Sequence, residues 1–107
     1  MHVVTNNQEK CAIALAALKN VIDPEIGLNI VDLGLIYELN FYEEDNLLSC
    51  TMTLTTQFCP MGDAITSGAS NALQLAFNQN KIDVNLTFEP AWSSELISDE
   101  GQQFLNR

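Results

Sequence analysis

The sequence predicts a single α+β domain, a two-layer α/β sandwich spanning residues 1–107. The chain is long enough for one modest core, and 47% of its residues are hydrophobic. Two segments have helical hydrophobic periodicity and three alternate with a period of two. Each alternating segment has one apolar and one polar face, so helices are expected to cover one side of a small mixed sheet. The predicted order is α-β-β-α-β with a short C-terminal helix.

The first helix is expected to open at Asn6, which forms a capping pair with Glu9. It is expected to end at Asp23, because Pro24 disfavours the α conformation in its predecessor. Its apolar stripe consists of Cys11, Ala14, Leu15, Leu18 and Ile22. Residues 23–34 contain two glycines and no clean period, which indicates an ordered loop, a feature that is often functional in a small domain.

Two strands with a hairpin turn at residues 43–46 are expected next. The apolar face of the strand at residues 35–41 is predicted to carry Leu35, Tyr37, Leu39 and Phe41. The apolar face of the strand at residues 47–55 is predicted to carry Leu48, Cys50, Met52 and Leu54. Ser49, Thr51, Thr53 and Thr55 are expected on the opposite, polar face.

The rest of the chain predicts a second helix, a third strand and short C-terminal turns. The helical stripe runs through Ile65, Ala69, Ala72, Leu73, Ala76 and Phe77. The inward face of the strand at residues 82–89 is predicted to carry Ile82, Val84, Leu86 and Phe88. Ser93, Ser94 and Ser98 can cap helical turns, and Trp92 is expected to anchor the C-terminal segment, with an interface contact as the alternative.

A formal net charge of −10 excludes several partner classes. Such a surface repels phosphate backbones and anionic membranes, so neither nucleic acid nor a membrane is expected as a partner, although a basic protein is compatible. No apolar run reaches the length of a transmembrane span, and the first residues lack the pattern of a signal peptide. A cytoplasmic protein is therefore expected.

The three cysteines are widely spaced and form no Cys-x-x-Cys motif, and the only histidine is His2. One subunit is therefore not expected to assemble a four-ligand zinc site, and free thiols in a reducing compartment follow. Cys11 and Cys50 fall within apolar stripes and are interpreted as core residues. Cys59 lies in a turn before a helix N-terminus, where the helix dipole and free amides favour a thiolate. The alternative for Cys59 is a buried packing role, which is common for free cysteine.

Carboxylates and hydroxyls provide further candidates. Asp23 and Glu25 flank Pro24, and the alternative is that both carboxylates are simply solvated in the loop. Thr55 and Thr56 end the second strand beside Cys59, so their hydroxyls could hydrogen-bond a thiolate or a ligand.

Four segments closely resemble the PaaD and SufT-like domain family, a former family of unknown function linked to iron–sulfur cluster assembly. They are DPEI (23–26), IVDLGLIY (30–37), TLTTQFCP (53–60) and EPAW (89–92). The resemblance extends over residues 10–105 and implies the iron–sulfur cluster assembly domain fold. It also implies that the family's cysteine corresponds to Cys59, its acidic pair to Asp23 and Glu25, and its strand-end threonines to Thr55 and Thr56.

The chain departs from the family in two places. PaaD proteins carry an additional cysteine-rich C-terminal segment, and its absence before Arg107 places this chain nearer the SufT-like members. The family often has a basic residue in its final helix, whereas Gly101, Gln102 and Gln103 supply none.

The leading hypothesis is a non-enzymatic accessory factor in iron–sulfur protein maturation. Cys59 would be a thiolate ligand for transient iron or an iron–sulfur cluster, exchanged with assembly proteins or apo-protein clients. One cysteine does not complete a cluster site, so a homodimer or a partner would supply the remaining ligands. The alternatives are a protein-binding adaptor without chemistry of its own and a thiol enzyme with Cys59 as nucleophile. The second is weakened by the lack of a nonterminal histidine to act as base.

Overall fold

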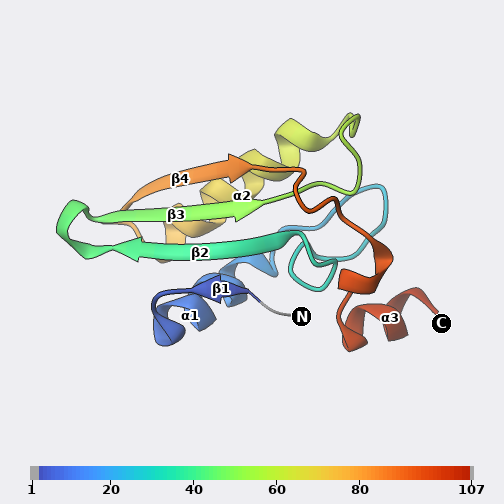
Figure 1. Ribbon diagram of the computed structural model, residues 1–107, viewed down its shortest axis with the longest axis horizontal. Coiled ribbons are helices and arrows are strands. Elements are labelled where there is room, and N and C mark those ends of the chain that lie inside the picture. Colours follow the sequence, from blue (N-terminus) through green and yellow to red (C-terminus); the bar gives the residue numbers. More distant parts are fainter. Residues whose placement is uncertain (1–2, 107) are drawn as a thin grey trace.

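A four-stranded sheet forms the centre of the computed structural model, which describes residues 3–106 (Figure 1). The strands lie in the order β1 (Val4–Thr5), β2 (Ile36–Tyr42), β3 (Leu47–Met52) and β4 (Lys81–Leu86). β1 is parallel to β2, β2 is antiparallel to β3, and β3 is parallel to β4. Three α-helices are formed by α1 (Gln8–Leu18), α2 (Gly62–Ala76) and α3 (Asp99–Leu105). Single 3₁₀ turns occur at η1 (Glu43–Asp45) and η2 (Ser94–Leu96).

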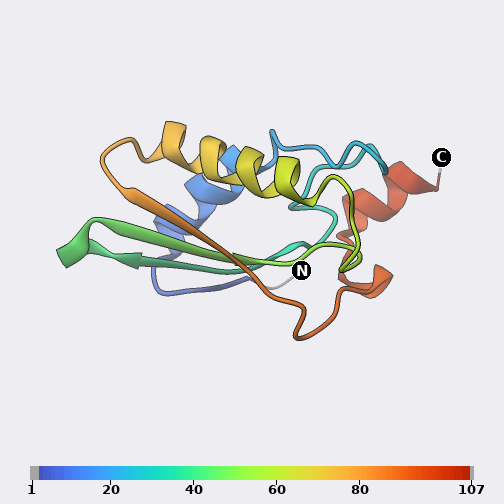
Figure 2. The ribbon, with the colours of Figure 1, turned by 90° about the horizontal axis from the view of Figure 1, so that it is seen from above.

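Helices α1 and α2 lie side by side on one face of the sheet, as Figure 2 shows from above. The hydrophobic core fills the space between these helices and the sheet, with buried side chains from α1, α2, β2 and β3. The predicted two-layer α+β fold and the α-β-β-α-β order with a short C-terminal helix are confirmed. β1 was not predicted, because two residues are too few to show a hydrophobic period.

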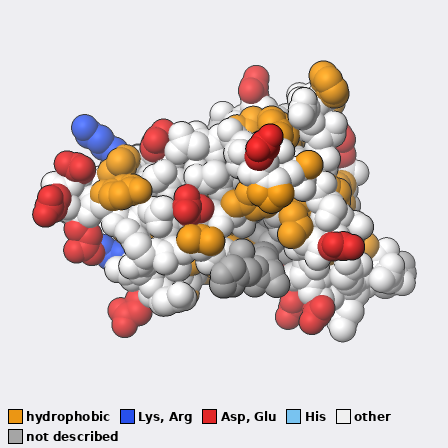
Figure 3. Space-filling view, viewed as in Figure 1, with side chains coloured by type: hydrophobic (Ala, Val, Ile, Leu, Met, Phe, Trp, Pro, Cys, Tyr) orange, Lys and Arg blue, Asp and Glu red, His pale blue; other side chains and the backbone are white. Residues whose placement is uncertain are grey.

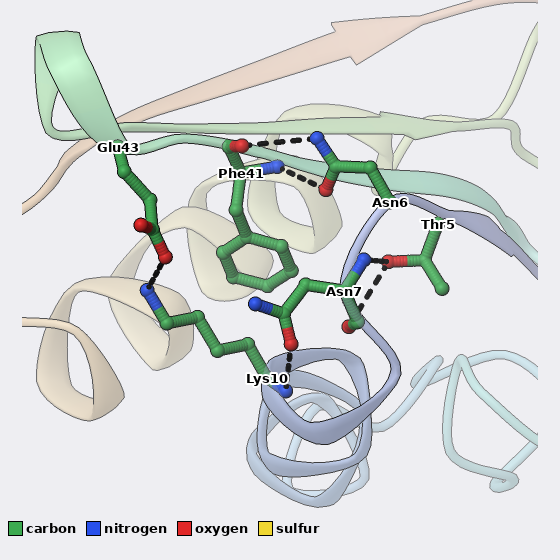
Figure 4. Close-up of polar contacts among 6 residues, drawn as sticks. All are labelled: Thr5, Asn6, Asn7, Lys10, Phe41 and Glu43. Atoms are coloured by element: carbon green, nitrogen blue, oxygen red, sulfur yellow. Dashed lines mark hydrogen bonds and ion pairs between the residues drawn. The ribbon is translucent and has the colours of Figure 1, made fainter.

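The N-terminal segment is tied to β2 by side chains (Figure 4). Asn6 uses its amide on both backbone groups of Phe41, accepting from the N–H at 2.9 Å and donating to the carbonyl at 3.0 Å. The side chain that caps α1 is that of Asn7, which accepts from the Lys10 N–H at 3.0 Å. The predicted capping role of Asn6 is therefore wrong by one residue, because the Asn6 side chain is hydrogen-bonded to the backbone of β2 instead.

Helix α1 ends at Leu18, earlier than the predicted end at Asp23. After Lys19 the chain turns back on itself, and Ile22 forms an isolated antiparallel bridge with Asn29. Ile22 consequently lies outside the helix and is exposed, instead of extending its apolar stripe. The ordered loop predicted at residues 23–34 is present and is hydrogen-bonded throughout.

A β-bulge interrupts the alternation of β2. The pairing passes from Ile36–Met52 to Glu38–Thr51, so Tyr37 has no opposite residue. Ile36 is buried in its place, while the Tyr37 hydroxyl donates to the Pro90 carbonyl at 2.8 Å. The predicted core position of Tyr37 is wrong because a single inserted residue shifts the face of its neighbours.

Strands β3 and β4 end earlier than predicted, at Met52 and Leu86. Thr53, expected on a polar face, is fully buried, and its N–H donates to the Leu35 carbonyl at 2.9 Å. Leu86, expected to point into the core, is an exposed residue because β4 is an edge strand with a neighbour on one side only.

The C-terminal segment leaves β4 at the loop end of the sheet and bends there toward the side away from α1 and α2, before it continues to α3 (Figures 1 and 2). Trp92 anchors this segment as predicted, because its Nε1–H donates to the Leu33 carbonyl at 2.7 Å. Ser98 caps α3 through the Gly101 N–H, as predicted, whereas Ser93, at the N-cap position of η2, makes no side-chain capping bond. Within the described residues, no helix is both long enough and apolar enough to cross a membrane.

Candidate functional site

Two loops meet at the end of the sheet opposite the β2–β3 hairpin. One is loop 23–34, and the other is the segment at residues 53–61 that joins β3 to α2 (Figures 1 and 2). All five residues predicted to form the site lie on these two loops. The fold therefore brings the acidic pair and the cysteine to the same end of the molecule.

Cys59 lies in the turn that precedes α2. Its carbonyl accepts from the Gly62 N–H at 3.1 Å, and the Met61 carbonyl accepts from Ile65 at 3.0 Å to begin the helix. Met61, at the N-cap position, provides no side-chain cap, so the start of α2 lacks the oxygen acceptor that a Ser, Thr, Asp or Asn side chain would supply there. Cys59 is half-buried against the core, and its Sγ has no hydrogen-bond partner among residues 3–106. The predicted position of the thiol before a helix N-terminus is observed, and the thiol is free.

The other two cysteines are core residues, as the sequence predicts. Cys11 packs from α1 and Cys50 from β3, and both side chains are buried. Burial raises the pKa of the Cys50 thiol to about 12, so this thiol stays protonated. Cys59 alone among the three is not buried.

Thr55 and Thr56 do not end β3 as predicted, because β3 ends at Met52, and they lie in the segment that leads to Cys59. The Thr56 Oγ1 accepts from the Phe58 N–H at 3.3 Å and so closes a tight turn. Thr55 is half-buried and Thr56 is exposed. Among the described residues, neither hydroxyl forms a hydrogen bond with Cys59. The Thr56 hydroxyl acts instead on the backbone of the turn, through its bond with the Phe58 N–H.

Asp23 and Glu25 have different environments. Asp23 is 2% exposed, and its Oδ1 accepts from the Glu25 N–H at 2.9 Å. Its backbone carbonyl accepts from Gly27 at 2.7 Å, where a positive φ of 83° suits glycine. Asp23 therefore organises the loop, while the Glu25 carboxylate is exposed. The alternative that both carboxylates are solvated holds for Glu25 and is wrong for Asp23.

The donor atoms at this end do not form a complete metal site. Within residues 3–106, no three side chains of His, Cys, Asp or Glu are placed to hold a metal ion together. The acidic pair and Cys59 are likewise not joined by a hydrogen bond in this part of the chain. His2 lies outside the described residues. Among the described residues, Cys59 is the one cysteine whose thiol is not buried.

Comparison with known proteins identifies the family. The family model described as iron–sulfur cluster assembly protein matches residues 12–86, which is more than half of the chain. The chain belongs to the iron–sulfur cluster assembly protein family. The SufT-like resemblance read from the four segments is thereby confirmed.

Relatives with assigned names and solved structures agree with this membership. The Fe–S protein maturation auxiliary factor of Porphyromonas gingivalis is 37% identical over 83 residues, covering 78% of each chain. The auxiliary factor SufT of Staphylococcus aureus is 36% identical over 78 residues, covering 73% of this chain and 88% of SufT. A crystal structure of a domain of unknown function from Bacillus anthracis superposes with a TM-score of 0.83 at 35% identity, covering 94% of this chain and 98% of that one.

In this member of the iron–sulfur cluster assembly protein family, the site includes two residues that the sequence analysis did not select. Phe58 is 87% exposed and Met61 is 36% exposed, and they lie on either side of Cys59 and Pro60. The sequence does contain a signal for an exposed Phe58, because this large aromatic residue lies among turn residues and outside any apolar stripe. The carboxylate of Asp32, which lies in the IVDLGLIY segment, connects loop 23–34 to α3 through Ser98.

Proposed function

We propose that this chain is an accessory factor in the maturation of iron–sulfur proteins, with Cys59 as a thiolate ligand for iron or a cluster in transit. The observation that carries the proposal is the free, partly exposed Cys59 at the loop end of a family member whose other cysteines are buried. Relatives named as maturation auxiliary factors support a non-enzymatic role. Its site of action would be the cytoplasm, where free thiols persist.

The donor set supports transient carriage. Iron–sulfur clusters are held mainly by cysteine thiolates, usually four, and residues 3–106 have one accessible thiol and no group of three donors. The cluster is therefore a cargo whose remaining ligands come from a second copy of the chain or from a partner protein. Iron–sulfur assembly proteins and apo-protein clients are the partners that this role requires.

The other predicted residues act around that thiol in this proposal. Asp23 holds the shape of its loop, and Glu25 presents an exposed carboxylate that can accept a proton or contact iron. Thr56 holds the turn before Cys59, and the half-buried Thr55 precedes this turn in the chain. None of these groups replaces the thiolate ligand.

Anaerobic reconstitution with ferrous iron and sulfide tests this proposal. Iron bound per chain, visible absorbance and mass in solution are measured for the wild type, Cys59→Ser and Cys11→Ala. We expect roughly one cluster per two chains or less, lost in Cys59→Ser and retained in Cys11→Ala, because only Cys59 reaches solvent. Circular dichroism confirms that each variant is folded.

Two outcomes would overturn this role for Cys59. One is a stable cluster on a monomer, and the other is iron binding that persists unchanged in Cys59→Ser. If the wild type binds no iron but still binds an apo-protein client, the adaptor function takes first place. That alternative is favoured by the exposed side chains beside Cys59.

A further inference from the structure

Phe58 and Met61 form an apolar tip on the loop that carries Cys59. Solvent reaches 87% of Phe58, although a phenylalanine ring is normally buried in a folded domain. Two hydrogen bonds define the tip, from the Phe58 N–H to Thr56 and from the Gly62 N–H to the Cys59 carbonyl. The ring is thus presented to solvent by an ordered turn.

The base of the apolar tip is attached to the core. Leu54 is buried immediately before the loop, and Cys59 packs against the same core. Gly62 follows the tip with its Cα so near Leu54 that an added Cβ would lie 2.8 Å from the Leu54 side chain. The segment that carries Phe58 and Met61 is therefore attached to the core through Leu54 on one side and Gly62 on the other. An exposed aromatic side chain held in this way is typical of an interface anchor.

Negative charge surrounds this end of the molecule. The loops, the first turn of α2 and the C-terminal segment contribute seven carboxylates here that are not buried: Glu25, Asp32, Asp63, Glu89, Glu95, Asp99 and Glu100. Of the lysines, Lys10 and Lys81 lie at the opposite, hairpin end, where Lys10 pairs with Glu43 and the Lys81 N–H donates to the Asn46 carbonyl. Lys19 is nearer the loop end, where its charge acts on Asp32, so carboxylates still outnumber lysines there. On the face shown in Figure 3, lysine side chains are visible only toward the hairpin end, at the left.

We propose that the apolar tip inserts into an apolar pocket bordered by lysine or arginine on the assembly or client protein that exchanges iron or a cluster with Cys59. This proposal rests on the proposed function and names its partner by chemistry. The carboxylates complement a cationic rim, whereas a second copy would bring the same charges together and an anionic membrane would repel them. Insertion of Phe58 and Met61 encloses Cys59 between two anchored side chains, so the remaining ligands come from the partner.

Site-specific crosslinking identifies the partner. p-Benzoylphenylalanine is placed at position 58 and, as a control, at position 75, because Leu75 is 85% exposed but lies on α2, away from the tip. After irradiation in the producing cells, the crosslinked protein is identified by mass spectrometry and purified. We expect a discrete adduct from position 58 on a partner peptide that contains Lys or Arg, and none of that adduct from position 75. No adduct from position 58, or an adduct mainly with a second copy, overturns the proposal.

Titration with the purified partner then measures the contribution of the apolar tip. We expect Phe58→Ala to weaken binding by roughly tenfold or more, as for a central aromatic anchor, and Leu75→Ala to leave the affinity unchanged. Raising sodium chloride from about 50 mM to about 300 mM should weaken wild-type binding through screening. Equal effects of the two substitutions, or an affinity independent of salt, would rule out this mode of docking.

The same titration separates docking from the role of the thiol. Cys59→Ser should bind the partner like the wild type but lose iron, whereas Phe58→Ala should retain iron binding and lose the partner. Normal partner binding by Phe58→Ala, together with iron binding that requires Cys59, rejects the docking proposal and leaves the proposed function intact. Partner binding that requires Phe58, in a wild type that binds no iron, rejects the role of Cys59 and supports docking.

Discussion

At the scale of single residues, the three cysteines are chemically alike but differ in burial. Cys11 and Cys50 are enclosed by the core, and the raised pKa of Cys50 keeps it in the unreactive thiol form. Cys59 has a free Sγ on a loop and a helix N-terminus after it. Position in the fold, and not the residue type, therefore decides which cysteine is available for chemistry.

We expect Cys59 to be the first thiol alkylated in the native protein. Limiting iodoacetamide is applied to the folded protein, and the adducts are located by peptide mass mapping. Cys11 and Cys50 should react only after unfolding in urea, which provides the internal control. Labelling of either core cysteine before Cys59 under native conditions would contradict this assignment.

At the scale of elements, α3 is too short to be stable alone and depends on its contacts with loop 23–34. The Ser98 Oγ donates to Asp32 at 2.8 Å and accepts from the Gly101 N–H at 3.0 Å, and Asn29 donates to the other Asp32 oxygen at 2.7 Å. Backbone contacts add to this, since Ser98 N–H donates to the Asp32 carbonyl at 2.8 Å. The Asp32 carboxylate is therefore a junction between two segments that are distant in sequence.

This junction predicts a specific loss of stability in acid. Partial burial acts to raise the pKa of Asp32, but hydrogen bonds from Asn29 and Ser98 and the charge of Lys19 outweigh it and lower the pKa. A carboxyl whose pKa is lower in the folded state stabilises the protein above its unfolded pKa and loses this effect as the pH falls below about 4. The free energy of unfolding should therefore be larger for the wild type than for Asp32→Asn near neutral pH, and this difference should shrink in acid.

Urea denaturation at about pH 6 and about pH 3 measures this difference. Glu44→Gln is the control, because Glu44 is an exposed carboxylate in the hairpin turn. A difference between wild type and Asp32→Asn that is equally large at both pH values would show that the charge of Asp32 does not stabilise the junction.

At the scale of the whole molecule, the C-terminal segment is held against loop 23–34 and the start of β2, at the loop end of the sheet. Trp92 donates to the carbonyl of the buried Leu33, and Tyr37 donates to Pro90, so this segment is held at two points. Gly34, at a φ of 85°, leaves room for the Leu96 carbonyl where a Cβ would collide. These contacts support the loop end from the side opposite α1 and α2.

We expect Trp92→Phe to lower the free energy of unfolding by about 1–3 kcal/mol, because it leaves a buried carbonyl without its donor. Tyr37→Phe removes a bond at a more exposed position and should cost less. Circular dichroism follows the urea transition, since the substitution removes the only tryptophan. Alkylation of Cys59 should be unchanged in both variants. A loss no larger for Trp92→Phe than for Tyr37→Phe would show that this bond does not anchor the segment.

The sequence by itself determined the fold class, the order of the main elements and the hairpin turn. It also distinguished the two core cysteines from Cys59, which lies in a turn. These features follow from local periodicity and turn chemistry, which short stretches of sequence express directly. The same reasoning located the two loops that carry the candidate site.

Only the tertiary structure decided the features that depend on residues distant in sequence. Asn6 pairs with Phe41, Tyr37 forms a bulge opposite β3, and Asp23 is buried by the loop that it closes. The exposure of Phe58 also belongs here, because burial depends on what the rest of the chain leaves uncovered. Hydrophobic pattern specifies which face of an element turns inward, but partner, register and exposure are set by contacts between elements, where one residue of shift reverses a face.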